Sequence, residues 1–337
     1  MQDIDKFNLI KQNTAEILTE EDLRELIKTK RNPKAYWGIA PTGPMHMGYL
    51  ASLTKIFDME RAGVETKIMV ADIHAALDDL KTPWEEVERR RNYYKLCIEH
   101  AFPWEKKPKI VFGSEFQFDR KYQADLLKLS TLTTINRAKR AASTVVRLKT
   151  PKVSEVIYPL MQALDEEYLG VDIQIAGEDH RQLLTFAREY LPKIGYKSRV
   201  EVMTPLVIGL KGPGVKMSAS IPETTLKIYD SEKTIEDKIK KAYCPEGVVT
   251  DNPVLQLCKF IVFPLKDRMK IERDDKFGGD VEFEFYESLE HAFKSKEIHP
   301  LDLKNALTGN LIDLFSNARK CFEKNKEMLK ELGKEYL

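Results

Sequence analysis

Short apolar runs rich in Val and Ile alternate with segments of helical periodicity between residues 35 and 191, and this alternation strongly constrains the fold. The apolar runs read AYWGIA, TKIMVADIHAAL, PKIVFGSE and VDIQIAGEDH. Helical segments are expected at 49–63, 84–100 and 181–191. Strands that alternate with helices form parallel β-α-β units, so we expect an α/β fold built on a doubly wound parallel sheet.

The character of the sequence changes after about Tyr229. Residues 231–247 are typical of a capped amphipathic helix, and helical periodicity continues through 303–332 with few strand signals. We therefore predict two domains. Residues 1–228 contain the sheet, an N-terminal helix and an inserted helical segment around 118–165, whereas residues 229–337 form a mainly helical domain.

Charge and cysteine content narrow the functional classes. Lys and Arg number 54 against 53 Asp and Glu, so any nucleic-acid contact must come from local basic clusters. The four cysteines lie far apart without zinc-ligand spacing, and no apolar stretch approaches the length of a membrane span. We expect a cytoplasmic protein with reduced thiols, no protein-ligated metal and no membrane partner.

Two glycine-containing loops hold the unusual residues. In PTGPMHMG, Gly43 and Gly48 allow a close backbone approach before a helix N-terminus, where His46 can donate to a phosphate. Equally, this segment can be a turn in which His46 only caps the helix. In GPGVKMSAS, Lys216 lies in a loop that suits a mobile polyphosphate clamp, or simply a surface loop.

Taken together, HMG after the first strand and KMSAS late in the sheet domain resemble the two signature motifs of class I aminoacyl-tRNA synthetases. The resemblance implies that an amino acid and ATP, with Mg²⁺, form an aminoacyl-adenylate. It assigns His46 to the phosphate transition state and Lys216 to the leaving pyrophosphate. The implied ATP-binding residues are Gly38, Thr42, Gly43, His46, Gly48, Gly177, Asp179, Lys216, Met217 and Ser218.

A finer resemblance concerns the amino acid. YWGIAPTG, ADIHAALDDLKTPW, GSEFQF, YPLMQALDEEYLGVD and HPLDLKNAL resemble tyrosyl-tRNA synthetases of the archaeal and eukaryotic form, over nearly the whole chain. This resemblance implies a Rossmann-like catalytic domain, a helical anticodon-binding domain and a homodimer. It also implies that Tyr36 and Asp165 hydrogen-bond the phenol of L-tyrosine.

The helix that carries Asp165 supports a polar pocket. Tyr158, Gln162 and Asp165 are spaced i, i+4 and i+7, so they line one face of that helix within an otherwise apolar segment. Without the family resemblance, a satisfied buried network would be the preferred interpretation. The resemblance adds further residues around the bound tyrosine, namely Met69, Asp72, His74, Gln117 and His180.

The chain departs from the family pattern at three positions. Tyr49 replaces a second histidine of the first motif, and Ala219 replaces the usual second lysine of the other. His180 stands where relatives carry a glutamine that contacts tyrosine. Adenylate formation remains the expected reaction despite these changes.

Two regions are expected to bind tRNA(Tyr). Residues 136–149 form a basic segment, and such a charge run is usually only a solvated face. The resemblance implies instead that Arg140 and Arg181 approach the first acceptor base pair, C1–G72. In the helical domain it implies anticodon contacts by Phe277, His299 and Asp302. The alternative for HPLD is a helix start with proline in its first turn.

The expected function is that of a tyrosine–tRNA ligase, against two alternatives. A tryptophanyl enzyme shares the fold, but indole offers only a donor and so suits Tyr36 and Asp165 poorly. The second alternative is a non-catalytic RNA-binding paralogue, in which the three departures mark decay. Retention of His46, Lys216 and the pocket residues argues against it.

Overall fold

The structure is a computed structural model. It describes residues 2–78, 81–102, 104, 107–145, 152–214, 217–218, 221–266 and 268–337. The chain divides into two compact units, and the division passes through helices α3 (Leu50–Arg61) and α5 (Val87–Ala101). The first unit is Met1–Thr42, Lys55–Leu96 and Lys106–Pro205, and the second is Gly43–Thr54, Cys97–Glu105 and Leu206–Leu337.

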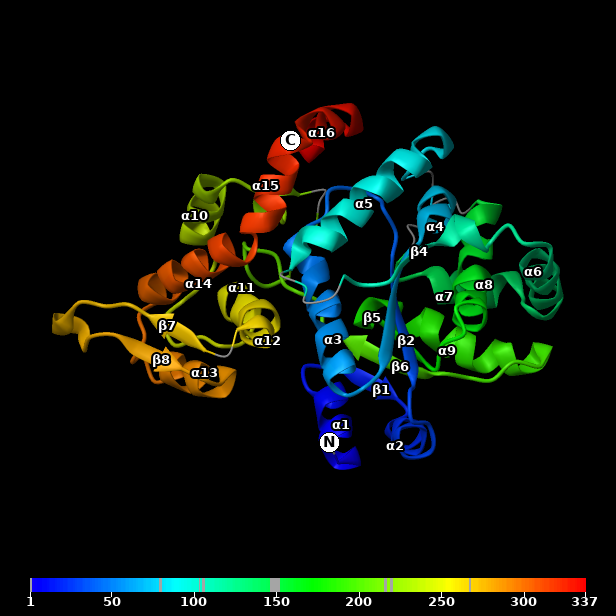
Figure 1. Cartoon of the computed structure of the whole chain (residues 1–337), viewed down its shortest axis with the longest axis horizontal. Helices are drawn as coiled ribbons and strands as arrows, with labels where there is room; N and C mark the ends of the chain where they lie inside the picture. The colour runs from blue at the N-terminus through cyan, green and yellow to red at the C-terminus, as the bar shows by residue number, and fades with distance from the viewer. Residues whose placement is uncertain are drawn as a thin grey trace. The chain divides into compact units, whose positions relative to one another are not determined.

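A six-stranded sheet forms the centre of the first unit, in the order β1-β6-β5-β2-β3-β4 (Figure 1). Neighbouring strands of this sheet pair in parallel, except that β1 pairs antiparallel with β6. The expected doubly wound sheet is therefore confirmed, with an antiparallel edge strand added. The strands are β1 Glu16–Leu18, β2 Lys34–Ile39, β3 Glu65–Val70, β4 Ile110–Phe112, β5 Ile173–Gly177 and β6 Val200–Thr204.

The strand order creates a switch point between β2 and β5. The chain adds β3 and β4 on one side of β2, then returns to add β5 and β6 on the other. In open α/β sheets, ligands bind beyond the carboxyl ends of the strands at such a point. The switch therefore directs attention to the residues at the ends of β2 and β5.

Helices surround the sheet of the first unit, and several were expected from local signals. Thr19 caps α2 by accepting a hydrogen bond from the Asp22 amide, as its spacing predicts. Besides α3 and α5, the helices are α1 Asp3–Lys11, α2 Glu20–Thr29, α4 Asp72–Leu77, α6 Arg120–Leu132, α7 Ile135–Ala142, α8 Val153–Tyr168 and α9 Arg181–Tyr190.

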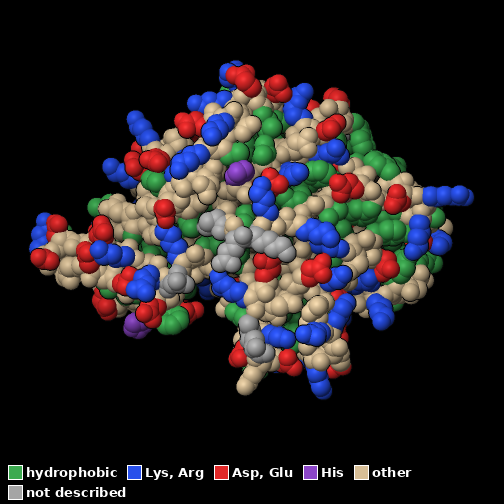
Figure 2. All heavy atoms as spheres, in the orientation of Figure 1, with side chains coloured by type: hydrophobic (Ala, Val, Ile, Leu, Met, Phe, Trp, Pro, Cys, Tyr) green, Lys and Arg blue, Asp and Glu red, His purple; other side chains and the backbone are tan. Residues whose placement is uncertain are grey.

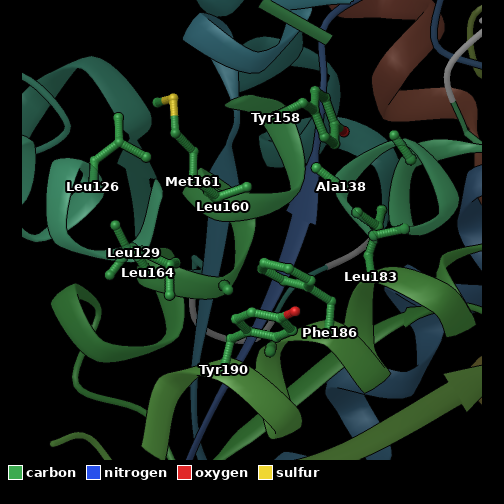
Figure 3. Close-up of a cluster of buried hydrophobic side chains, with 14 of the residues drawn as sticks. Leu126, Leu129, Ala138, Tyr158, Leu160, Met161, Leu164, Leu183, Phe186 and Tyr190 are labelled. Atoms are coloured by element: carbon green, nitrogen blue, oxygen red, sulfur yellow. The ribbon is translucent and has the colours of Figure 1, made fainter. Parts of the chain in front are cut away.

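Helix α8 is the centre of a helical layer. It packs against α6, α7 and α9, and Figure 3 shows side chains such as Leu129, Leu164 and Phe186 meeting in their shared apolar core. The buried side chains of α8 include polar ones as well, Gln162 and Asp165 among them. One helix thus supplies both the core of this layer and a buried polar surface.

The second unit is mainly helical, but it also contains the antiparallel pair β7 Met269–Ile271 and β8 Val281–Phe283. The periodic region 303–332 forms parts of three consecutive helices. Its helices are α10 Glu232–Lys241, α11 Pro253–Leu257, α12 Phe263–Leu265, α13 Tyr286–Lys294, α14 Pro300–Leu314, α15 Ser316–Lys324 and α16 Lys326–Leu332.

Three local expectations needed correction. The run TKIMVADIHAAL is not one strand, because β3 ends at Val70 and α4 begins at Asp72. Strand β6 was missed, since Glu201 interrupts its apolar pattern although its side chain is fully buried. The β7–β8 pair was missed because each strand has only three residues, and the middle one is charged. In the part of the chain that the structure describes, no helix has the length and apolarity needed to cross a membrane.

Candidate active site

Two buried residues of the first unit, Tyr36 on β2 and Asp165 on α8, form the centre of a cluster of buried polar side chains, which we call the polar pocket. Each side chain belongs to a residue only 1% exposed. Burial, followed by the nearby charge of Asp165, raises the pKa of the Tyr36 phenol well above its usual range. Tyr36 therefore keeps a neutral hydroxyl that can both donate and accept a hydrogen bond.

The two oxygens of Asp165 have different surroundings. Oδ1 accepts hydrogen bonds from Gln117 Nε2 at 2.8 Å and from the Tyr122 hydroxyl at 2.9 Å. Oδ2 lies 3.5 Å from His74 Nε2, which is too long for a good hydrogen bond. One oxygen is thus held by two donors, while the other has no short hydrogen bond among the described residues.

The charge state of the pocket follows from burial. Burial raises the pKa of Asp165 to about 7, although hydrogen bonds from Gln117 and Tyr122 act in the opposite direction. Burial, with the charge of His180, lowers the pKa of His74 to about 3, so His74 is neutral. Near neutral pH the pocket therefore presents a titrating acceptor, Asp165, beside a neutral donor, Tyr36.

Two further atoms in this pocket lack partners. Among the described residues, His74 Nε2 and Gln117 Oε1 are buried without a hydrogen-bond partner. Gln117 Nε2 also lies 3.3 Å from His74 Nδ1, so the Gln117 amide links His74 to Asp165. Buried polar groups are usually paired, and unpaired ones in a pocket fit a site that is completed by a polar ligand.

The predicted face of α8 is present. The Tyr158 ring meets His74 edge-on with centroids 4.7 Å apart, and Gln162 Nε2 lies 3.3 Å from His180 Nδ1. Met69 shares a buried cluster with Tyr36. The structure thus places in one unit the residues predicted around tyrosine: Tyr36, Met69, His74, Gln117, Tyr158, Gln162, Asp165 and His180.

Asp72, which was also expected around the bound tyrosine, makes hydrogen bonds to the residues that follow it and to the turn after β4. Its carboxylate accepts hydrogen bonds from the amides of Ile73 and Ser114 and from the Ser114 hydroxyl, at 3.0, 2.9 and 2.6 Å. These bonds tie the start of α4 to the turn after β4. Asp72 therefore fixes the backbone next to His74.

The second unit holds the segment around His46. His46 Nδ1 accepts a hydrogen bond from the Gly48 amide at 3.1 Å, which fits the tautomer with its proton on Nε2. This contact gives His46 a capping role, and its role toward phosphate stays a prediction. Tyr49, which replaces the second histidine, stacks on the His46 ring with centroids 4.2 Å apart.

The two signature segments approach each other within the second unit. A Cβ at position 48 would lie 2.8 Å from His46 Nδ1 and 3.1 Å from Met217 Cβ, so only glycine fits there. The Met47 amide also donates to the Leu226 carbonyl at 2.8 Å, which anchors the first segment beside Leu226 and Lys227, a few residues after KMSAS. Lys216 and Ala219 lie outside the described residues.

The residues predicted to bind ATP divide between the two units. Gly38 lies on β2, and Gly177 ends β5, so both flank the switch point of the sheet. Thr42 and Asp179 also belong to the first unit, whereas Gly43, His46, Gly48, Met217 and Ser218 belong to the second.

The predicted tRNA-binding residues are at the surface or at helix starts. Arg140 is exposed on α7, and Arg181 forms a bidentate ion pair with Glu16 at 2.7 and 2.9 Å. Phe277 is 61% exposed. His299 caps α14 by accepting from the Leu301 amide, with Asp302 in the first turn, so HPLD is a helix start with proline in its first turn.

Sequence reasoning missed four buried polar residues near this pocket: Tyr122, Glu166, Gln174 and Glu201. Strand register aligns Tyr36 with Gln174 and Gln174 with Glu201, which puts the three in one row on the same face of the sheet. Burial raises the pKa of Glu201 to about 8 and that of Glu166 well above its usual range. Gln174 within IQIAG and Glu201 within VEVM, each a single polar residue in an apolar run, were the available signal.

Within the ranges that the structure describes, no group of three or more His, Cys, Asp or Glu side chains is arranged to hold a metal ion.

Comparison with known proteins first defines the class. Residues 28–316 match the family of tRNA synthetases class I (W and Y). A tyrosine–tRNA ligase from Archaeoglobus fulgidus is 44% identical over 94% of this chain and 97% of its own length. The cytoplasmic tyrosine–tRNA ligase of Danio rerio is 42% identical over 95% of this chain and 61% of its own length.

A solved structure agrees with the sequence relatives. Tyrosyl-tRNA synthetase from Archaeoglobus fulgidus, complexed with L-tyrosine, matches with a TM-score of 0.90 and 43% identity, over 95% of this chain and 99% of that chain. The chain therefore belongs to the tyrosyl-tRNA synthetases of the archaeal and eukaryotic type, which are class I ligases that use ATP.

The raised pKa of Asp165 predicts a stability cost. Its folded-state value of about 7 lies above the usual 3.8, so unfolding releases a proton between these pH values and stability falls as pH rises through that window. Asp165→Asn removes the ionisation while retaining an oxygen for Gln117 and Tyr122. At pH 8 we expect the free energy of unfolding of the variant, measured by urea titration, to exceed that of the wild type by about 1–3 kcal/mol. At pH 4 the two values should be nearly equal.

Asp125→Asn is the matched control. Burial acts to raise the pKa of Asp125, but hydrogen bonds from Tyr196, Lys128 and Tyr168 outweigh it and lower the pKa. This variant should therefore lose stability at pH 8. A loss in both variants would contradict the assignment of Asp165 as a buried, costly carboxylate.

Proposed function

We propose that this chain activates L-tyrosine with ATP to tyrosyl-adenylate and pyrophosphate, then transfers tyrosine to the 3′-terminal adenosine of tRNA(Tyr). The observation that carries the proposal is the buried pair of Tyr36 and Asp165. A phenol hydroxyl has one donor and one acceptor function, and this pair offers the complementary functions. Membership of the tyrosyl-tRNA synthetase family supports the same substrate.

The phenol would donate to Asp165 Oδ2 and accept from the Tyr36 hydroxyl. Asp165 Oδ1 is already held by two donors, so the free oxygen has a defined direction. Tyr158, Gln162 and His180 would then lie near the amino end of the substrate, in keeping with their implied tyrosine contacts. A site of this kind binds tyrosine by shape and by paired hydrogen bonds.

Adenylate formation requires no proton transfer by the protein. A carboxylate oxygen of tyrosine attacks the α-phosphorus of ATP, a new P–O bond forms, and the bond to the bridging oxygen breaks as pyrophosphate leaves. His46, in the tautomer with its proton on Nε2, would donate to the charged phosphate oxygens, and Lys216 would bind the leaving pyrophosphate. Stacking on Tyr49 would hold the His46 ring in place.

Mg²⁺ belongs to this proposal only as a companion of ATP. The described side chains include no cluster that would hold a metal ion. The cation would therefore enter with the nucleotide, since phosphate oxygens are its preferred ligands in such sites.

The remaining roles extend the proposal to tRNA. Residues 1–228 would form the catalytic domain and residues 229–337 the anticodon-binding domain. The exposed Phe277 ring offers a stacking face, and His299 and Asp302 stand together at the start of α14. We also infer a cytoplasmic location, because the Danio rerio relative is named a cytoplasmic enzyme.

A homodimer is the proposed assembly, and an exposed apolar surface supports it. The surface comprises Phe118, Leu127, Leu132 and Ile135, all large apolar side chains with more than a third of their area exposed. They belong to α6 and the segments beside it, and Figure 2 shows hydrophobic side chains gathered toward that side of the view. Exposed apolar side chains gathered on one helix and its flanks are a common feature of association surfaces.

The activity is tested by ATP–pyrophosphate exchange with tyrosine, phenylalanine and tryptophan. We expect exchange with tyrosine and a kcat/KM for phenylalanine lower by roughly 10⁴ to 10⁵, a discrimination known for tyrosyl-tRNA synthetases rather than one that this structure supplies. Exchange with tryptophan would establish the tryptophanyl alternative. Binding of tRNA(Tyr) without any exchange would favour a non-catalytic RNA-binding protein.

Acceptor recognition is tested by Arg181→Ala. Arg181 would exchange its ion pair with Glu16 for the C1–G72 pair, so we expect kcat/KM for charging C1–G72 tRNA to fall about 10-fold or more, with little effect on pyrophosphate exchange. Glu16→Gln, which frees Arg181, should keep full charging. G1–C72 tRNA should be a poor substrate for the wild type. Equal losses of exchange and charging in Arg181→Ala would indicate a folding defect.

Dimerisation is tested by Leu127→Glu. Leu127 is 67% exposed, and a buried carboxylate at an apolar interface is costly, so the variant should be monomeric in light scattering at micromolar concentration. Val248→Glu changes an exposed apolar residue of the second unit and should remain dimeric. A monomeric wild-type protein would rule the homodimer out.

A further inference from the structure

Tyr122 on α6 contacts the polar pocket, although it was not among the predicted site residues. The residue is completely buried, and its hydroxyl lies 2.9 Å from Asp165 Oδ1 and 2.9 Å from the Met161 carbonyl oxygen. Because the hydroxyl has a single proton, it donates to the stronger acceptor, the Asp165 carboxylate. Its ring packs edge-on against Tyr168 and Phe116, with centroids 4.8 and 5.8 Å apart. The position of the hydroxyl is therefore fixed by packing on several sides.

The hydroxyl acts on one oxygen of Asp165 only. Gln117 Nε2 and the Tyr122 hydroxyl both reach Oδ1, whereas neither contacts Oδ2. A carboxylate held by two donors on one oxygen cannot rotate about its terminal bond without breaking both hydrogen bonds. The orientation of Oδ2 thus depends on what holds Oδ1.

We propose that Tyr122 is a positioning residue for tyrosine selection, which orients Asp165 so that Oδ2 accepts the hydrogen bond of the substrate phenol. This inference rests on the proposed function and deepens it. Tyr122 does not touch the substrate in this arrangement. Its effect passes through Asp165, and its contribution is to the binding of the phenol rather than to the chemistry at phosphorus.

The same hydrogen bond favours the ionised form of Asp165. Burial raises the pKa of Asp165, and the bonds from Gln117 and Tyr122 act against that rise. The other titratable or charged groups around Asp165 are His74 and Asp72 at α4, Tyr36 on β2, and Tyr158 and Glu166 on α8. Loss of the Tyr122 hydroxyl would leave these groups unchanged and shift the titration of Asp165 toward higher pH.

Tyr168 offers a matched control within the same aromatic cluster. Its ring is adjacent to that of Tyr122, but its hydroxyl donates to Asp125 Oδ2 at 2.7 Å. Tyr122→Phe and Tyr168→Phe therefore each remove one hydroxyl from the same cluster. Only the first removes a contact to Asp165.

The experiment measures tyrosine-dependent ATP–pyrophosphate exchange from pH 6 to 9 for the wild type and both variants, with thermal unfolding of each. For Tyr122→Phe we expect KM for tyrosine to rise about 10-fold, while kcat and KM for ATP stay nearly unchanged. The acidic limb of kcat/KM for tyrosine should move to higher pH, and the preference for tyrosine over phenylalanine should fall. Tyr168→Phe should show none of these changes.

Several outcomes would overturn the inference. If Tyr122→Phe leaves KM for tyrosine and the pH profile unchanged, Tyr122 has only a structural role. The same conclusion follows if both variants change equally and in step with their loss of thermal stability. If the wild-type protein shows no tyrosine-dependent exchange, the proposed function fails and this inference fails with it. Normal wild-type exchange with an unaltered Tyr122→Phe variant would overturn the inference alone.

Discussion

The carboxyl group of Asp165, held away from water in the first unit, is the interaction on which the rest of the pocket depends. Taking a carboxylate out of water is expensive, and the cost is reduced here by two hydrogen bonds to one oxygen. Those donors come from the turn after β4 and from α6, while the acceptor comes from α8. Secondary-structure elements far apart in the sequence are thus organised around a single side chain.

The sheet topology explains why these elements meet. The switch point between β2 and β5 leaves Tyr36 beside Gln174 in the register, under a helical layer centred on α8. The position of α8 gives Asp165 a buried setting, and its apolar side chains anchor it to α6, α7 and α9. Stability and recognition therefore share one helix, and its polar face is tolerated because neighbouring groups satisfy much of it.

Part of this arrangement was predictable from the sequence. The i, i+4, i+7 spacing of Tyr158, Gln162 and Asp165 predicts their shared face, and the family motifs identify His74, Gln117 and His180 as their neighbours. Tyr122 was not predictable, since a tyrosine in an amphipathic helix gives no sign of which buried group its hydroxyl meets. Gln174 and Glu201 were missed because a row across a sheet depends on strand register, which local patterns do not specify. The part played by Tyr49 beside His46 also required coordinates.

The titration of Asp165 near neutral pH has a consequence for binding itself. If the phenol binds to the ionised form, tyrosine binding lowers the pKa of Asp165, and a protein that is partly protonated must then release protons as it takes up its substrate. The heat of binding measured near pH 7 would therefore depend on the ionisation enthalpy of the buffer. A fold that isolates one acidic group from water thereby makes recognition of a neutral phenol a proton-linked event.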